Sequence, residues 1–183
     1  MKKLTLYLVF LSGFLQAQVA IEKSAITNTS VSLEFGNVNK AIVLPWVNST
    51  AEVEAKGVVP GSLVFDAADK KVKWYREDPN FPGQNWFDFT ADESGAVDPS
   101  LQTPLEEKPD AKVIIGNNPS TDSATNGILI LGDTNKAMIL PKVASPHLNI
   151  INPQPGMIVY DTNTKFVMTY NGTVWSFWRP EVF

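Results

Sequence analysis

The chain has 183 residues, of which 44% are hydrophobic and none is cysteine, and its formal net charge is −4 at pH 7. The absence of cysteine excludes disulfide bonds and metal sites built on thiolates. A mildly acidic chain without a basic cluster is poorly suited to bind nucleic acid or an anionic membrane surface.

The first 17 residues resemble a secretory signal peptide. Lys2 and Lys3 precede an apolar run at 4–15, and the small residue Ala17 follows it, which is the pattern of a cleavable signal. The run is shorter than the roughly 20 apolar residues of a membrane-spanning helix. We expect cleavage after Ala17 and a mature chain that is exported, to the cell surface, the extracellular space or the periplasm, with no membrane span. Removing Lys2 and Lys3 takes the formal net charge to −6.

A polar lead-in (18–30) is followed by a first β-rich unit (31–89). Residues 31–35 alternate polar and apolar side chains, as in a half-buried strand. A turn at 36–40 and an apolar run at 41–47 predict that the unit begins with a hairpin. Pro45 cannot donate a ladder hydrogen bond, so we expect it to end its strand or to lie at a sheet edge.

The rest of the first unit predicts a short helical turn and three strands. The polar stretch 48–59 contains AEVEAK, a candidate for one helical turn. Strands are predicted at 62–65, 71–75 and 86–89, with an insertion at 76–85 before the last of them. This arrangement makes Trp86 the expected counterpart of Trp175 in the second half of the chain.

A linker (90–124) separates this unit from a second one (125–183). The linker is rich in Pro, Ser, Asp and Glu and holds one short apolar run at 113–115, which predicts one added strand. In the second unit, Asn171-Gly172 joins two aromatic and β-branched runs, a strong hairpin signal because both residues accept positive φ. The second unit is therefore expected to end in a three-strand meander.

The two units are copies of one another. Residues 33–47 (LEFGNVNKAIVLPWV) align with 129–143 (LILGDTNKAMILPKV) at a shift of 96, and residues 60–75 align with 155–170 at a shift of 95. An internal repeat of this kind favours a structural or binding protein over one with a single catalytic centre. The sequence therefore predicts an all-β protein of two short β-meander or hairpin repeats. A unit of about 60 residues is only marginally stable when alone.

Asp66 and Asp161 occupy equivalent positions one residue past a predicted strand. They could be calcium ligands, or they could hydrogen-bond the backbone of the turn that each of them begins. A calcium loop needs further carboxylates at alternate positions, and 161–165 offers only one. We therefore interpret Asp66 and Asp161, together with Asn171 and Gly172, as structural turn residues.

Catalytic and cofactor sites find little support in the sequence. His147 is the only histidine and lies in a polar connector, and no nucleophile, zinc or phosphate-loop motif occurs. We expect no enzyme activity, no cofactor and no metal.

Three residues are candidates for contact with a ligand or a partner. Trp46 aligns with Lys142, so this position accepts a charge and is expected to be exposed. Trp178 lies near the end of the last predicted strand. Exposed tryptophan can stack on sugar rings or pack against another protein.

The pattern NKAxxLPxV, then PGxxxYD, then YNGTxW resembles a repeat of secreted proteins of Bacteroidetes, many of them described as tail-fibre-like or surface proteins. The resemblance covers both repeats and implies an exported, elongated, non-enzymatic protein. Trp46 and Lys142 stand where that repeat often has arginine. Asp122-Ser123-Ala124 also resembles the O-glycosylation signal of that phylum, with Ser123 as the acceptor.

Two functions remain open at this point. The first is a structural or adhesive surface component that self-associates through its β-units or binds another envelope protein. The alternative is a glycan-binding module of the cell envelope that uses exposed tryptophans.

Overall fold

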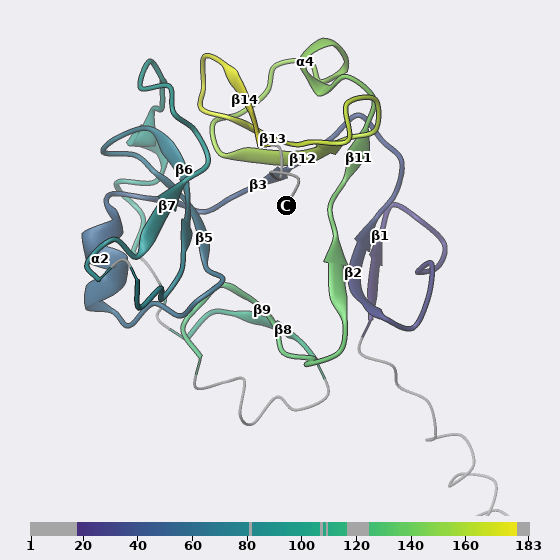
Figure 1. Ribbon diagram of the computed structural model, residues 1–183, viewed down its shortest axis with the longest axis horizontal. Helices are drawn as coiled ribbons and strands as arrows, with labels where there is room; N and C mark the ends of the chain where they lie inside the picture. The colour runs from purple at the N-terminus through teal and green to yellow at the C-terminus, as the bar shows by residue number, and fades with distance from the viewer. Residues whose placement is uncertain (1–17, 81, 107, 109, 117–124, 179–183) are drawn as a thin grey trace, which may run out of the picture.

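The computed structural model describes residues 18–80, 82–106, 108, 110–116 and 125–178. The chain is mostly strands, which confirms the predicted all-β class, and it forms a β-solenoid whose strands line the sides of a ring (Figure 1). Two short α-helices, α2 (Thr50–Ala55) and α4 (Pro146–Asn149), and the 3-10 turn η1 (Pro99–Leu101) lie outside the sheets. No helix in the described part of the chain is long and apolar enough to cross a membrane. The predicted signal peptide lies outside the described residues.

The strands are short and are distributed over four sheets. Their bounds in chain order are β1 Val19–Ile21, β2 Val31–Phe35, β3 Ile42–Val43, β4 Trp46–Val47, β5 Leu63–Asp66, β6 Lys71–Tyr75, β7 Trp86–Asp88, β8 Val113–Ile115, β9 Leu129–Leu131, β10 Ala137–Ile139, β11 Lys142–Val143, β12 Met157–Asp161, β13 Val167–Tyr170 and β14 Trp175–Trp178.

The internal repeat reappears as two sheets with the same strand order. The first has the order β4-β5-β6-β7 and the second the order β11-β12-β13-β14. In both, the first strand is parallel to the second, and the remaining pairs are antiparallel. Trp86 pairs with Tyr75, and Trp175 pairs with Tyr170, so the two tryptophans are counterparts as predicted. The three-strand meander β12-β13-β14 is also confirmed.

The predicted hairpin between 31–35 and 41–47 is wrong. Strand β2 instead lies between β1 and β10 and is parallel to both, so its neighbour β10 comes from more than 100 residues further along the chain. Strand β3 crosses to the second repeat and pairs antiparallel with β12. The solenoid explains the difference, because the chain turns around the ring after β2 and returns beside it only one circuit later (Figure 1).

Strand β2 is buried on both faces, although its sequence alternates polar and apolar residues. Glu34 points into a cover formed by the lead-in, where it accepts hydrogen bonds from the Thr27 amide (2.6 Å) and hydroxyl (2.6 Å). Lys23 completes this site with an ion pair of 2.7 Å. The Lys23 ammonium and the Thr27 donors lower the pKa of the Glu34 carboxyl to about 2.

Strand β8 in the linker is confirmed and pairs in parallel with β9, and the helical turn predicted at 51–56 is α2, over 50–55. Ser49 caps α2, since its side chain accepts from the Glu52 amide.

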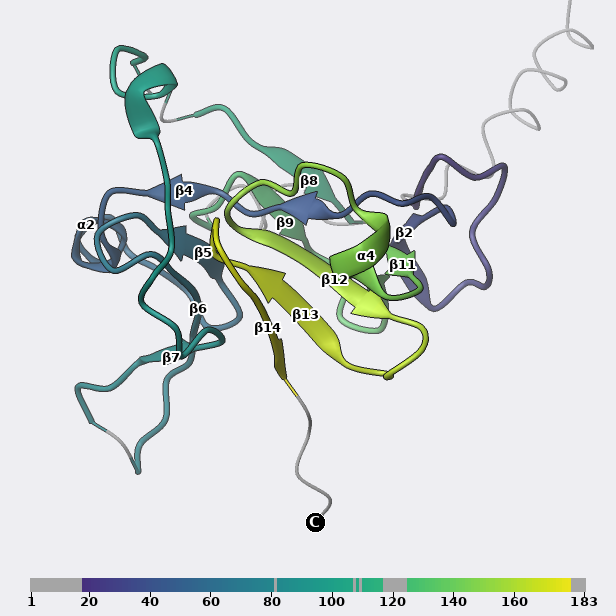
Figure 2. The same ribbon diagram turned by 90° about the horizontal axis from the view of Figure 1, so that it is seen from above.

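Seen from above, the sheets of the two repeats, β4-β5-β6-β7 and β11-β12-β13-β14, project to the same side of the ring (Figure 2).

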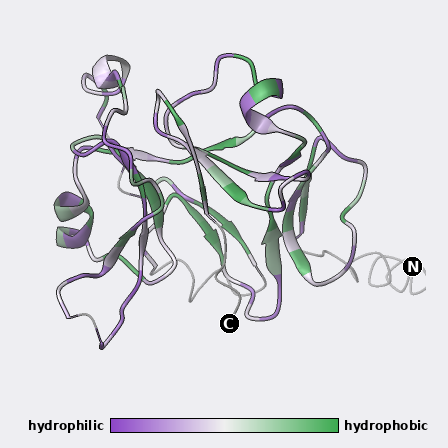
Figure 3. Ribbon diagram, turned by 45° about the horizontal axis from the view of Figure 1, so that its top comes forward, coloured by the Kyte–Doolittle hydropathy of each residue, from purple (hydrophilic) through white to green (hydrophobic). Residues whose placement is uncertain are grey.

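Two clusters of buried apolar residues hold the solenoid together. The larger centres on Leu44, Phe65, Val72 and Ile158 and therefore joins β5 and β6 of the first repeat to β12 of the second. The smaller contains Val143, Ile150, Val159 and Met168 and belongs to the second repeat. Hydrophobic residues lie mainly along the strands, and many of the connecting loops are hydrophilic (Figure 3). The first cluster shows that the two repeats pack directly against each other.

Candidate self-association surface

Asp66 and Asp161 each close the turn that follows their strand. The Asp66 carboxylate accepts from the Ala68 amide at 2.9 Å, and the Asp161 carboxylate accepts from the Asn163 amide at 2.9 Å. Each also receives a backbone amide from the segment that begins the neighbouring helix, Thr50 at 3.2 Å and Ser145 at 2.9 Å. These carboxylates therefore fix the loop between the first and second strands of each repeat.

The electrostatics of Asp161 agree with this structural role. Burial raises the pKa of its carboxyl, but hydrogen bonds from the Asn163 amide, the Thr164 hydroxyl and the Ser145 amide outweigh burial and lower it overall. Its hydrogen-bond donors are backbone amides and a hydroxyl of its own turn and of the segment before α4. The described residues contain no group of three or more acidic, histidine or cysteine side chains placed to hold a metal ion.

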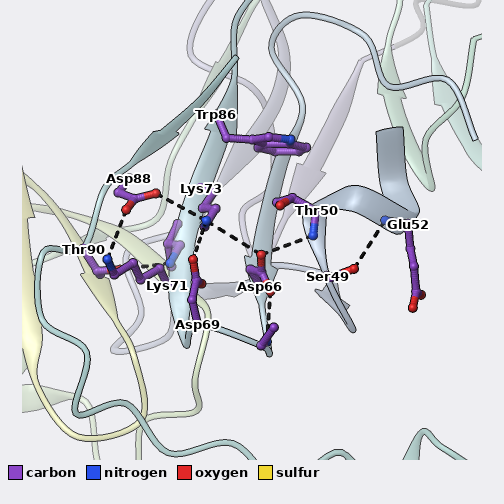
Figure 4. A network of polar contacts seen from close by, with 12 residues as sticks. Ser49, Thr50, Glu52, Asp66, Asp69, Lys71, Lys73, Trp86, Asp88 and Thr90 are labelled. Carbon is purple, nitrogen blue, oxygen red and sulfur yellow. Dashed lines mark hydrogen bonds and ion pairs between the residues drawn. The ribbon is translucent and has the colours of Figure 1, made fainter. Parts of the chain in front are cut away.

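The first repeat carries a network of charges on its outer face (Figure 4). Lys73 contacts Asp69 and lies 3.6 Å from Asp88 and 3.8 Å from Asp66. Burial lowers the pKa of Lys73, but the carboxylates around it, Asp69 foremost, raise it overall, so the ammonium stays charged. Lys71 forms a second ion pair with Asp88, at 3.2 Å.

The equivalent face of the second repeat is apolar. Phe166 and Phe177 occupy the positions of Lys71 and Asp88, and their rings stack with centroids 5.7 Å apart. Phe177 is 64% exposed. An exposed ring stack in place of an ion pair indicates a surface that is more stable when covered by another apolar surface.

Other large apolar side chains of the second repeat are exposed as well. Leu148 and Ile151, at and after α4, are 73% and 84% exposed. Further exposed apolar residues lie along both halves of the chain: Val19, Ile21, Val43, Leu105, Val113, Ile128, Leu129, Val174 and Trp178.

The structure places the three contact candidates in different surroundings. Trp46 is half-buried between the repeats, where its indole N–H donates to the Pro155 carbonyl at 2.8 Å and its ring tilts against Phe65. The interpretation of Trp46 as an exposed side chain therefore does not hold, because the second repeat covers it. Lys142 is exposed on β11.

Trp178 remains 42% exposed, with its ring edge-to-face against Phe89 at 6.3 Å. His147 lies on α4, and Ser123 lies outside the described residues.

The linker contributes a contact that the sequence did not indicate. Its segment 92–96 crosses the β13–β14 turn, where Asn171 donates to Asp92 at 3.0 Å and accepts from the Ala96 amide at 3.2 Å. Ser94 and Thr173 share a further hydrogen bond of 2.9 Å. The polar composition of this segment is typical of a linker, and the full burial of Asn171 beneath it becomes visible only in the structure.

Residues 114–180 match a family model described as a phage tail like trimerisation region. The match covers 67 of the 183 residues and extends from β8 to beyond β14. No curated protein and no solved structure matches the chain. The C-terminal part of the chain is thus similar to a region through which phage tail-like proteins trimerise, which fits the tail-fibre-like resemblance of its repeats.

Proposed function

We propose that this protein is an exported, non-enzymatic structural component that self-associates, as a trimer, into a fibre-like or adhesive assembly at the cell surface. The observation that carries the proposal is the similarity of 114–180 to a phage tail like trimerisation region. Because the matched segment contains all the strands of the second repeat, from β9 to β14, we assign association chiefly to that half of the chain.

The surface chemistry supports association. Phe177, Leu148 and Ile151 are each more than 60% exposed. Burying a side chain of this kind yields about 1.5–3 kcal/mol, so three copies of such a surface offer a substantial driving force. Among the described residues, the sheets also have strand edges that pair with no further strand, and such edges favour pairing with another chain.

Export and a non-catalytic role rest on the sequence. The signal-peptide pattern at 1–17 supports export, and the Bacteroidetes-like repeat supports a surface location. The sequence has no catalytic motif, and the equivalent carboxylates Asp66 and Asp161 serve as turn residues. Together with the internal repeat, this supports a structural role over an enzymatic one.

The test is the solution mass of residues 18–183, measured by light scattering over a concentration series. The proposal predicts a species of three times the chain mass. Phe177→Asp should dissociate it, whereas Asp88→Asn, at the equivalent position of the first repeat, should leave the mass unchanged. A concentration-independent monomer would overturn the proposal.

Glycan binding is a second candidate, and the exposed Trp178 at the end of edge strand β14 favours it. An exposed indole ring can stack on a sugar ring. Binding to a glycan panel that is lost in Trp178→Ala and retained in Trp74→Phe would support it. A flat response across the panel would exclude it.

A further inference from the structure

Strand β3 of the first repeat closes one edge of strand β12 in the second. Val43 lies opposite Met157, and Ile42 lies opposite Ile158. The Leu44 amide extends the ladder by donating to the Gly156 carbonyl at 2.9 Å. This pairing is the backbone part of the contact that joins the two repeats.

Side chains complete the same contact. A Cβ placed on Gly156 would lie 2.9 Å from Cβ of Phe65 and 3.2 Å from the Trp46 indole nitrogen. The Trp46 indole also donates to Pro155, as described above. The Pro155-Gly156 turn therefore lies tightly against the first repeat.

The equivalent edge of the first repeat is open. The repeat shift places Pro60-Gly61-Ser62-Leu63 on 155–158. The Phe65 amide donates to the Pro45 carbonyl, so Leu63, two residues earlier on β5, presents its amide to that same edge. Leu63 pairs with Trp74 of β6 on the other edge, but on this edge β4 reaches only Phe65 and Asp66, and no strand among the described residues pairs beside Leu63. A Cβ on Gly61 would meet no atom within 4 Å, in contrast to Gly156.

The counterpart of β3 is β10, and it also has an open edge. Strand β10 is the last strand of the sheet β1-β2-β10. Its Ala137 amide donates to the Ser30 carbonyl on the β2 side at 2.8 Å. The register of this pairing shifts between Ala137 and Met138, and among the described residues no strand pairs with the other edge of β10. The chain cannot satisfy both edges itself, because β5 and β2 lie on opposite sides of the ring (Figure 1).

We propose that β10 of one copy pairs antiparallel with β5 of a second copy and so repeats, between chains, the contact that β3 and β12 make within one chain. The proposal rests on the self-association proposed above and adds to the exposed apolar side chains of the second repeat a strand pairing whose other half, β5, lies in the first repeat. The repeat correspondence sets the register: Met138 lies opposite Leu63, and Ile139 lies opposite Ser62. The Leu140 amide then donates to the Gly61 carbonyl.

Two side chains take the places of those inside the chain. Lys142 donates to the Pro60 carbonyl, as Trp46 does to Pro155, and Tyr160 packs over Gly61, as Phe65 does over Gly156.

This contact is head-to-tail, because it joins two different surfaces of the same chain. Each copy offers β10 at one end and receives a strand at β5 at the other. Contacts of this kind close into a ring when the rotation between copies permits and otherwise grow into a filament. A closed ring of three copies satisfies every such edge.

Cysteine cross-linking tests the register directly, since the chain has no cysteine of its own. Ser62 and Ile139 would form a pair without mutual ladder hydrogen bonds, with Cα atoms about 4.5 Å apart, a spacing that suits a disulfide. Oxidised Ser62→Cys/Ile139→Cys should run as covalent multimers on non-reducing gels. Mixed samples of the two single variants should give covalent dimers that contain one copy of each, whereas neither single variant alone should give this product.

The matched control is Val43→Cys/Met157→Cys, the equivalent pair within one chain, which should give an intramolecular disulfide and no multimer. If the protein assembles and this control oxidises, but Ser62→Cys/Ile139→Cys stays unlinked, the proposed interface is wrong and the proposed function stands. A monomer in light scattering overturns the proposed function and the interface together.

Discussion

Replacing Gly172 by alanine tests whether the linker is part of the folded second repeat. Gly172 has a φ of +101°, and an added Cβ would lie 1.9 Å from the Ala96 carbonyl oxygen and 2.9 Å from the Ala96 nitrogen. Segment 92–96 must therefore leave the β13–β14 turn to make room. Gly83 is the matched control, because its φ is +81° but a Cβ there would meet no atom within 4 Å.

The expected loss of stability follows from these contacts. Both variants force alanine into a left-handed conformation, which costs about 1–3 kcal/mol. Gly172→Ala also breaks the three linker hydrogen bonds, from Asn171 to Asp92, from Ala96 to Asn171 and between Ser94 and Thr173. At about 0.5–1.5 kcal/mol each, these bonds add a loss of about 1.5–4.5 kcal/mol. We therefore expect Gly172→Ala to be about 2–4 kcal/mol less stable than Gly83→Ala.

Urea unfolding followed by tryptophan fluorescence measures this difference, with both variants at one protein concentration because assembly adds a concentration-dependent term. Hydrogen exchange gives a second measurement, since the Ala96 amide should lose its protection in Gly172→Ala and keep it in Gly83→Ala. Free energies of unfolding that agree within about 0.5 kcal/mol, the usual effect of a surface change, would refute the docking of the linker on this turn.

Three further outcomes are expected. The folded-state pKa of Glu34 is lowered to about 2 from an ordinary 4.5, so the stability that its charge contributes is complete above pH 4.5 and is lost as the pH falls toward 2. The melting-temperature difference between wild type and Glu34→Gln should therefore shrink over that range. A constant difference would contradict the argument. Asp161→Ala removes the acceptor of several backbone amides and should cost about 2–4 kcal/mol in urea unfolding, with a loss under 1 kcal/mol counting against the turn role. Trp46→Phe keeps an aromatic ring but leaves the Pro155 carbonyl without its indole donor, so it should cost about 1 kcal/mol, which thermal unfolding would detect.

The sequence was sufficient to predict the parts of the fold that depend on local chemistry. Asn171-Gly172 specifies its hairpin because both residues accept turn geometry, and the meander of the second repeat follows from it. Asp66 and Asp161 could be read as turn residues for the same reason. Because the two halves of the chain align, a turn or strand predicted in one half predicts the same element at the aligned position of the other half.

Pairings between distant strands could not be predicted in this way. The alternation in 31–35 shows that a strand forms but does not say whether its neighbour is five or 100 residues away. Ser32 and Glu34 look like a solvent face, and they are buried because the lead-in folds over them and supplies Lys23 and Thr27 to the Glu34 carboxylate. A buried charge of this kind is visible only once its neighbours are placed.

Trp46 shows a second limit, which arises from the repeat itself. Its exposure was inferred from the charge at Lys142, on the assumption that equivalent positions have equivalent surroundings. In a row of identical units, however, each unit contacts the next through one surface and the previous one through another. Trp46 contacts the second repeat, whereas Lys142, at the equivalent position of the second repeat, is exposed.

The same reasoning explains why contacts between repeats favour association between copies of this chain. A contact that joins unit one to unit two in a head-to-tail manner always leaves one half of itself unused at each end of the pair. In the part of the chain that the structure describes, the unused halves are the outer edge of β10 and the edge of β5 beside Leu63, whose counterparts β3 and β12 are paired within the chain. Since unpaired strand edges template the addition of further strands, they must be covered or they promote uncontrolled aggregation. In a closed set of copies, β10 of each chain covers the β5 edge of the next. Both edges are then paired through positions equivalent to those that β3 and β12 already use within one chain.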